Sequence, residues 1–309
     1  MLAAGTKADV MIRATLTGHY REDARYTSAT VNVTNHCNLA CEHCFIYRDG
    51  NPNAAPKSIR AEMSDADMLE TLEGLRDRHG LSSMLWMGGE PLLKRKLLAK
   101  GVRLFARNTI TTNGTIPLPD FGPRVHYVVS LDGPEDLNDA IRGAGTFRRV
   151  LRNLCELPPG FSSTVQVQCT VTRRNQHRLG ELVEALRETP VGWMTFSFYV
   201  PTKGDAGENA WPTNEDRAVA VHEVLRLKAL HGAFIRNGTR SLELMLPPDC
   251  EAVTADCPTR KSLLPLWLDG DHFTTPFCCY GNDVDCSRCG AWVVFEFAAR
   301  RERATRERA

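Results

Sequence analysis

Segments typical of β-strands alternate with helical patterns through the first two thirds of the chain, and this alternation limits the possible folds more than any other feature. Short apolar and β-branched runs, such as SATVNVTNH, are followed by runs with apolar residues three and four positions apart. Six strands are expected, within residues 28–36, 82–90, 108–114, 124–133, 163–172 and 192–200. Strands that alternate with helices predict parallel βαβ units. The pattern alone fits both a doubly wound sheet and a barrel.

The helical patterns lie between these strands. The first runs from Ser64, a suitable N-cap, to Gly80, and its apolar residues fall at helical spacing. Others are expected at 92–106, 145–157, 177–189 and 215–232. Beyond this point the βα alternation stops and cysteines become frequent. The sequence therefore predicts an N-terminal segment at 1–28, an α/β domain at 29–235 and a cysteine-rich extension at 236–309.

Composition narrows the function classes. The 309 residues have a net charge of +1, which gives no reason to expect nucleic-acid binding. No segment has the roughly 18 apolar residues of a membrane span, and the first residues do not resemble a signal peptide. Eleven cysteines without an export signal point to a reducing cytoplasm and to metal or catalytic use. The basic end, ARRERATRERA, is expected to be a solvated, frayed tail.

Three of the cysteines, Cys37, Cys41 and Cys44, crowd into the stretch NHCNLACEHCF. A structural zinc ion usually takes four ligands, so it would need a distant fourth residue here. A disulfide needs an even number of thiols and an oxidising compartment. Thiolates are the usual ligands of iron–sulfur clusters, and three of them on a 4Fe–4S cube leave one iron open.

The spacing C-x3-C-x2-C resembles that of the radical S-adenosylmethionine (SAM) superfamily. The resemblance covers roughly residues 29 to 200 and implies a partial (β/α)6 TIM-like barrel. It also implies that the three cysteines hold a 4Fe–4S cluster whose open iron binds SAM. His43 stands where family members commonly have an aromatic residue near the adenine of SAM.

Three further motifs are similar to family segments that contact SAM. MGGEP follows the second expected strand, TTNGT follows the third, and SLDGPEDLNDAIRG follows the fourth. The last resembles the branch with C-terminal extensions called SPASM and twitch. Asp132 is either a turn former or an acceptor for ribose hydroxyls. The resemblance implies cofactor contacts at His43, Gly88, Gly89, Glu90, Asn113, Ser130, Asp132 and Arg142.

Six cysteines follow residue 249, and the last two form Cys286-x-x-Cys289. This end resembles a twitch extension with one auxiliary 4Fe–4S cluster, although its glycine-to-cysteine spacing departs from the pattern. A zinc knuckle and unligated thiols are the alternatives. The expected ligands are Cys257, Cys286, Cys289 and one of Cys278 or Cys279, with Cys250 as a further candidate. The isolated Cys155 and Cys169 are expected to be buried as small apolar residues.

The resemblance implies an enzyme that cleaves SAM reductively, with an electron donor such as flavodoxin or ferredoxin, and abstracts hydrogen from a substrate. An auxiliary cluster that accepts an electron from the substrate radical favours a dehydrogenase. If that cluster is only structural, redox-neutral decarboxylation, epimerisation or radical addition is possible. Few residues precede the cysteine loop, so a small molecule (a sugar, aminocyclitol or nucleoside) is expected rather than a peptide with a leader. A peptide-modifying maturase and a non-catalytic zinc or iron–sulfur protein remain alternatives.

Overall fold

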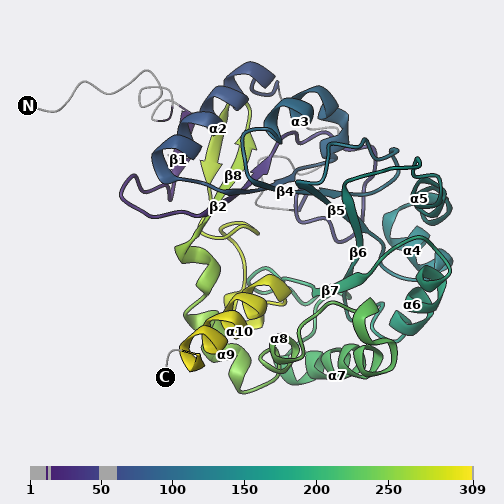
Figure 1. Cartoon of the computed structure of the whole chain (residues 1–309). Helices are drawn as coiled ribbons and strands as arrows, with labels where there is room; N and C mark the ends of the chain where they lie inside the picture. The colour runs from purple at the N-terminus through teal and green to yellow at the C-terminus, as the bar shows by residue number, and fades with distance from the viewer. Residues whose placement is uncertain (1–11, 13–14, 49–60, 308–309) are drawn as a thin grey trace, which may run out of the picture.

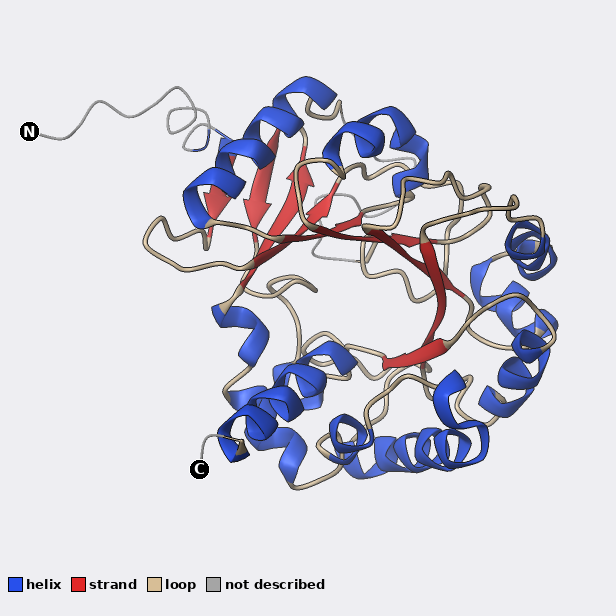
Figure 2. Cartoon of the chain, in the orientation of Figure 1, coloured by secondary structure: helices blue, strands red, loops and turns tan. Residues whose placement is uncertain are grey.

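One sheet of nine strands organises the chain, and the computed structural model describes residue 12, residues 15–48 and residues 61–307 of it (Figures 1 and 2). The strand order is β1-β9-β8-β2-β3-β4-β5-β6-β7. The strands are β1 (Leu16–Gly18), β2 (Ser28–Asn32), β3 (Ser83–Met87), β4 (Arg107–Thr112), β5 (Val125–Ser130), β6 (Thr164–Val171), β7 (Met194–Phe198), β8 (Leu263–Asp269) and β9 (His272–Thr275).

Strands β2 to β7 are parallel neighbours in chain order, and the helices between them lie outside the curved sheet (Figure 1). The sheet does not close on itself. The expected partial (β/α)6 barrel is therefore confirmed. The helices are α2 (Asp65–His79), α3 (Arg95–Gly101), α4 (Glu135–Arg142), α5 (Thr146–Cys155), α6 (Leu179–Arg187), α7 (Asn214–His231), α8 (Thr239–Glu243), α9 (Asp249–Ala255) and α10 (Trp292–Arg306). Short 3-10 helices are η2 (Pro91–Lys94), η3 (Gly232–Phe234), η4 (Pro258–Lys261) and η5 (Cys286–Arg288).

Helix α2 shows how local sequence sets the ends of an element. Ser64 Oγ accepts a hydrogen bond from the Asp67 N–H at 3.2 Å and caps the first turn. At the other end Gly80 takes φ 68°, a left-handed conformation that glycine adopts at little cost. Met68, Leu72 and Leu75 lie between these caps at 0% exposure, packed into the core.

Three strands that the sequence analysis did not predict extend the sheet beyond β2. Strand β8 pairs in parallel with β2, β9 pairs with β8 in the antiparallel direction, and β1 pairs in parallel with β9. Segments from the N-terminal and the C-terminal parts of the described residues thus join the same sheet as the barrel strands. The expected boundaries near residues 28 and 235 do not interrupt this sheet, and the division into three units stays a prediction.

The basic C-terminal segment is largely exposed to solvent, as expected, but it is helical through Arg306, so the prediction that it is frayed is wrong for the described residues. Helix α10 is anchored near its start by the buried Val294 and Phe295. Farther along, Arg240 Nε donates to Glu302 Oε2 at 2.8 Å and ties the helix to α8. Figure 1 shows α8, α9 and α10 gathered near the β7 end of the sheet. Among the helices of the described residues, none has the length and apolar character needed to cross a membrane.

Candidate active site

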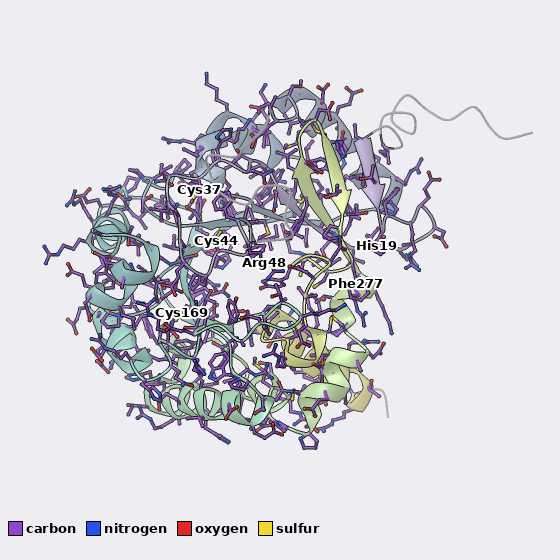
Figure 3. All side chains as sticks on the ribbon, turned by 180° about the vertical axis from the view of Figure 1, so that it is seen from behind. His19, Cys37, Cys44, Arg48, Cys169 and Phe277 are labelled. Carbon is purple, nitrogen blue, oxygen red and sulfur yellow. The ribbon has the colours of Figure 1, made fainter. Side chains whose placement is uncertain are left out.

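The loop that carries Cys37, Cys41 and Cys44 follows β2, at the carboxyl end where barrel enzymes build their sites. All three thiols are half-buried. Figure 3 shows Cys37, Cys44 and Arg48 inside the ring formed by strands and helices. The loop is fixed by its own backbone, since the Cys44 N–H donates to Cys41 O at 3.2 Å and the Leu39 N–H points at Cys37 Sγ, 3.4 Å away.

Burial keeps these thiols protonated in the absence of a metal. It raises the pKa of Cys37 to about 11, and it raises the pKa of Cys41 and of Cys44 as well. A metal cluster binds thiolates, so its assembly on this loop must release protons. We therefore expect the iron content after reconstitution to fall as the pH is lowered.

The glycines of MGGEP lie against the cysteine loop. The Gly89 N–H donates to Thr34 O at 2.7 Å, and the Glu90 N–H donates to His36 O at 2.8 Å. A Cβ atom at Gly88 would lie 2.3 Å from Thr34 O, and one at Gly89 would lie 2.2 Å from His36 O. The two glycines are therefore required for this close backbone contact. Their predicted contacts with a cofactor stay a prediction.

Replacing Gly89 by alanine is expected to lower the free energy of unfolding by about 1–3 kcal/mol, because the new methyl group overlaps the backbone of the cysteine loop. Denaturant titration measures this. Gly180→Ala is the matched control: it lies in α6, and its Cβ would meet Leu227 at an ordinary 3.6 Å. That variant should keep its stability or gain up to about 1 kcal/mol. Equal losses in both variants would contradict the explanation.

Glu90 joins the loops that follow β3 and β4. Its side chain is 0% exposed, and its carboxylate accepts from the Leu92 N–H at 2.9 Å, Thr112 Oγ1 at 2.7 Å and the Asn113 N–H at 2.8 Å. Burial raises the pKa of Glu90, and these three donors counteract the rise. The carboxylate thus holds two loops in register, a role that the motif alone did not suggest.

Asn113 connects the loop after β4 to the cysteine loop. Its Nδ2 donates to Asn38 Oδ1 at 2.9 Å and lies 3.8 Å from Cys37 Sγ. Asn38 in turn donates from Nδ2 to Thr115 Oγ1 at 2.8 Å. These bonds place an amide donor beside the first cysteine. Asn38 and Thr115 were not among the predicted residues.

Asp132 binds two of the other predicted residues. Its Oδ2 accepts from Arg142 Nε at 2.6 Å and lies 2.8 Å from His43 Nε2, while its Oδ1 accepts from the Thr170 N–H at 2.9 Å. The carboxylate is fully buried, and burial opposes its ionisation. Arg142 and His43 outweigh this effect and hold the pKa of Asp132 below its usual range. Ser130 ends β5 nearby and is half-buried.

The contacts among Asp132, Arg142 and His43 orient Arg142 toward the cysteine loop. With Nε bound to Asp132, the outer nitrogen Nη1 lies 3.9 Å from Cys41 Sγ. A guanidinium held in this way offers its outer nitrogens to an anion near the cysteines. Both carboxylate oxygens of Asp132 have protein donors, so the residue acts here on Arg142 and His43. Its predicted contact with ribose stays a prediction.

A second cysteine site lies in the C-terminal part of the chain. A single cavity is lined by Cys257, Cys278, Cys279, Cys286 and Cys289, together with apolar side chains such as those of Val200, Val284 and Val294. The structure thus gathers five of the six thiols that the sequence analysis considered for an auxiliary cluster. Cys250, the further candidate, is buried outside the lining of this cavity.

The two cysteine sites are in contact through neighbouring residues. Phe45, next to Cys44, packs on Tyr280, next to Cys279, with ring centroids 5.2 Å apart. Arg48 donates to the carbonyl of Tyr280 and, at 2.9 Å, to Asp283 Oδ1. No sequence motif marks this connection, because it joins segments more than two hundred positions apart.

Within the described residues, no three His, Cys, Asp or Glu side chains converge as the ligands of one metal ion do. The thiols of a 4Fe–4S cube bind separate irons and need no common point, so both cysteine groups fit such a cube. Of the two isolated thiols, Cys169 is buried as expected. Cys155 is exposed, so that part of the prediction is wrong: Val150 and Leu154 form the buried face of α5, and Cys155 lies beside it at the helix end.

Comparison with known proteins decides the family. The model of the radical SAM superfamily matches residues 31–158, which include the cysteine loop, MGGEP, Asn113, Ser130, Asp132 and Arg142. Residues 31–158 of the chain carry a radical SAM domain. Such a domain implies a 4Fe–4S cluster and SAM as cofactors. The three half-buried thiols fit the cluster, and the guanidinium directed at them fits an anionic group of SAM.

Curated relatives are similar in sequence to part of this chain. The AdoMet-dependent heme synthase of Nitratidesulfovibrio vulgaris is 28% identical over 187 residues, which cover 57% of this chain and 48% of the relative. The mycofactocin maturase MftC of Mycobacterium tuberculosis is 31% identical over 162 residues, 49% of this chain and 39% of the relative. The chain spans less than half the length of these two relatives.

A solved structure has the same fold at low identity. The structure described as native anSMEcpe with bound AdoMet and Cp18Cys peptide superposes with a TM-score of 0.60. Its sequence is 19% identical, and the superposition covers 87% of this chain and 80% of that one. At this identity the similarity supports the radical SAM fold alone.

Proposed function

We propose that this protein is a radical SAM enzyme that carries a second iron–sulfur cluster and oxidises a substrate bound between its two cysteine sites. One observation carries the proposal. The loop with Cys37, Cys41 and Cys44 is held from three sides, by the MGGEP backbone, by Asn113 and by the Asp132–Arg142 pair.

Each group has a distinct task in this proposal. The three thiols would hold three irons of a cube and leave one accessible. When bound, the reduced cluster and SAM supply a 5′-deoxyadenosyl radical that removes a hydrogen atom from the substrate. Asp132 fixes Arg142, whose outer nitrogens suit the carboxylate of SAM. Glu90 and Asn113 hold the neighbouring loops in place around the cysteines.

The test is anaerobic reconstitution with iron and sulfide, followed by dithionite and SAM. Dithionite replaces the flavodoxin or ferredoxin that we propose as the natural electron donor. Formation of 5′-deoxyadenosine is expected. Protein that is loaded with iron and binds SAM, yet forms none, would contradict the proposal and leave a non-catalytic iron–sulfur protein.

The cavity with five cysteines supports the second cluster and with it an oxidative outcome. The contact between Phe45 and Tyr280 joins the two cysteine sites, so a cluster held by the cavity thiols would be available to accept an electron from a substrate radical. A zinc ion in this cavity would instead favour redox-neutral decarboxylation, epimerisation or radical addition. Metal analysis of anaerobically purified protein distinguishes the two cases.

For the substrate we propose a small organic molecule, as in the tetrapyrrole chemistry that the name of the heme synthase indicates. Neither relative named above is by its name a sugar or nucleoside enzyme, so a sugar, aminocyclitol or nucleoside rests on the sequence analysis alone. The second candidate is a peptide, favoured by the maturase and by the peptide bound in the anSMEcpe structure. Transfer of deuterium from labelled candidates into 5′-deoxyadenosine decides between the classes.

Arg142→Lys is expected to weaken SAM binding by about tenfold, since a lysine cannot bond to Asp132 and also present a bidentate fork. Equilibrium binding of SAM to the reconstituted protein measures the effect. Arg148→Lys is the matched control, because its side chain is 76% exposed on α5. Unchanged SAM affinity with a lower affinity for substrate would show that Arg142 serves the substrate instead.

A further inference from the structure

Arg217 is a buried cation without a carboxylate partner. It lies on α7 and is only 2% exposed. Its Nη1 donates to Cys289 O at 2.7 Å and to Arg288 O at 3.1 Å, and its Nη2 donates to Met245 O at 3.1 Å. Its Nε is buried and has no partner among the described residues. Three carbonyls satisfy much of the hydrogen bonding but leave a full positive charge inside the protein.

Buried charges are ordinarily paired, because removing an unpaired charge from water is unfavourable. The carboxylate that acts on Arg217 electrostatically is that of Glu251, an exposed residue whose Oε1 accepts from Asn214 Nδ2 at 2.9 Å. In the part of the chain that the structure describes, Arg217 forms no ion pair with a carboxylate, and the ionisable side chains that act on it most strongly are the thiols of Cys250 and Cys289. Arg217 is therefore a buried cation whose strongest electrostatic neighbours are cysteine thiols and not carboxylates.

The position of Arg217 indicates which group its charge acts on. Both carbonyls that Nη1 binds belong to the Cys286-x-x-Cys289 turn, and Cys286 and Cys289 line the cavity with five thiols. The guanidinium of Arg217 thus contacts the backbone of the turn that carries two of the cavity thiols. Thiolate ligands leave a 4Fe–4S cluster with a net negative charge, which grows when the cluster is reduced.

We propose that Arg217 is the counter-charge of the second cluster and raises its reduction potential. The inference rests on the proposed second cluster. The reduced cluster carries one more negative charge than the oxidised one, so a fixed cation nearby stabilises the reduced form more. The couple involves one electron, with no bond made or broken. Arg217 makes the cluster a better acceptor for an electron from the substrate radical.

The experiment measures the midpoint potential of the second cluster by anaerobic titration with dithionite, which supplies the electron. Full-length protein with Cys37, Cys41 and Cys44 replaced by alanine is the parent, so that only the second cluster contributes. Arg217→Gln should lower the equilibrium constant for reduction by about tenfold, which equals about 59 mV for a one-electron couple. Arg217→Lys, which keeps the charge, should stay near the parent. Arg226 lies on the same helix with its side chain 60% exposed, so Arg226→Gln should leave the midpoint potential unchanged.

Each outcome has a defined meaning. An unchanged potential in Arg217→Gln, or equal shifts in the Gln and Lys variants, overturns the proposal. If Arg217→Gln melts cooperatively but holds no iron while Arg217→Lys holds it, the charge is needed for the cluster, which supports the proposal. If neither variant melts cooperatively, Arg217 serves the fold and the proposal is wrong. Absence of iron in the parent itself would instead contradict the second cluster.

Discussion

Replacing Cys37, Cys41 and Cys44 together by alanine is expected to abolish the formation of 5′-deoxyadenosine from SAM. The three thiols are the ligands that we propose for the SAM-cleaving cluster, and alanine cannot bind iron. The fold should survive, since the thiols are half-buried and the backbone of their loop is held by bonds to Gly89 and Glu90. Chromatography of reaction mixtures with dithionite and SAM measures the product.

Cys155→Ala is the matched control, because Cys155 is an exposed thiol on α5 outside both cysteine sites. It should form 5′-deoxyadenosine at the rate of the unchanged protein. Cys169 is less suitable as a control, because it is buried and Arg142 lies within electrostatic range of it. Undiminished SAM cleavage in the triple variant would place the catalytic cluster elsewhere in the chain.

The six barrel strands and their helices could be predicted from the sequence because each depends on a pattern within one segment. In α2 the cap at Ser64 and the buried Met68, Leu72 and Leu75 are local features. The parallel order then follows from the alternation of strands with helices, since each helix returns the chain to the same edge. The resemblance to the radical SAM family, rather than the alternation, favoured a barrel over a doubly wound sheet.

The strands outside the barrel were missed for a physical reason. In β8 the buried Leu264, Leu266 and Leu268 show the alternation of a strand, but Pro265 lies between them. A proline inside a run argues against a central strand because it has no N–H to donate. Its pairing with β2 also joins opposite ends of the chain, so no local pattern could indicate it.

The motifs indicated where the active site lies, but the sequence did not reveal how its residues support one another. Gly88 and Gly89 were expected to contact the cofactor, which stays a prediction, and in the structure they also allow close backbone contact with Thr34 and His36. Asp132 was a turn former or a ribose acceptor, and it proves to hold Arg142 and His43. Such roles depend on contacts between distant loops, which spacing within one motif does not encode.

Protein without Cys37, Cys41 and Cys44 is expected to retain about four irons per chain after anaerobic reconstitution, the content of one cube. Additional replacement of Cys286 and Cys289 by alanine should remove this iron. The reason is geometric: both thiols line the same cavity as Cys257, Cys278 and Cys279, and a cube that loses two ligands cannot be held by the rest. Iron and sulfide analysis, together with the visible absorption of the cluster, measures the result.

Cys250→Ala in the same background is the control, because Cys250 is buried outside the cavity lining and should leave the iron content unchanged. The cluster would also stabilise this part of the chain, since its proposed ligands lie just before η4, at η5 and at the turn near Cys278. Loss of iron should therefore lower the melting temperature of the quintuple variant below that of the triple variant. Zinc instead of iron in anaerobically purified protein, with no iron in the triple variant, would contradict the second cluster. That result would direct the expected chemistry toward redox-neutral reactions and leave the first cluster as the centre of the enzyme.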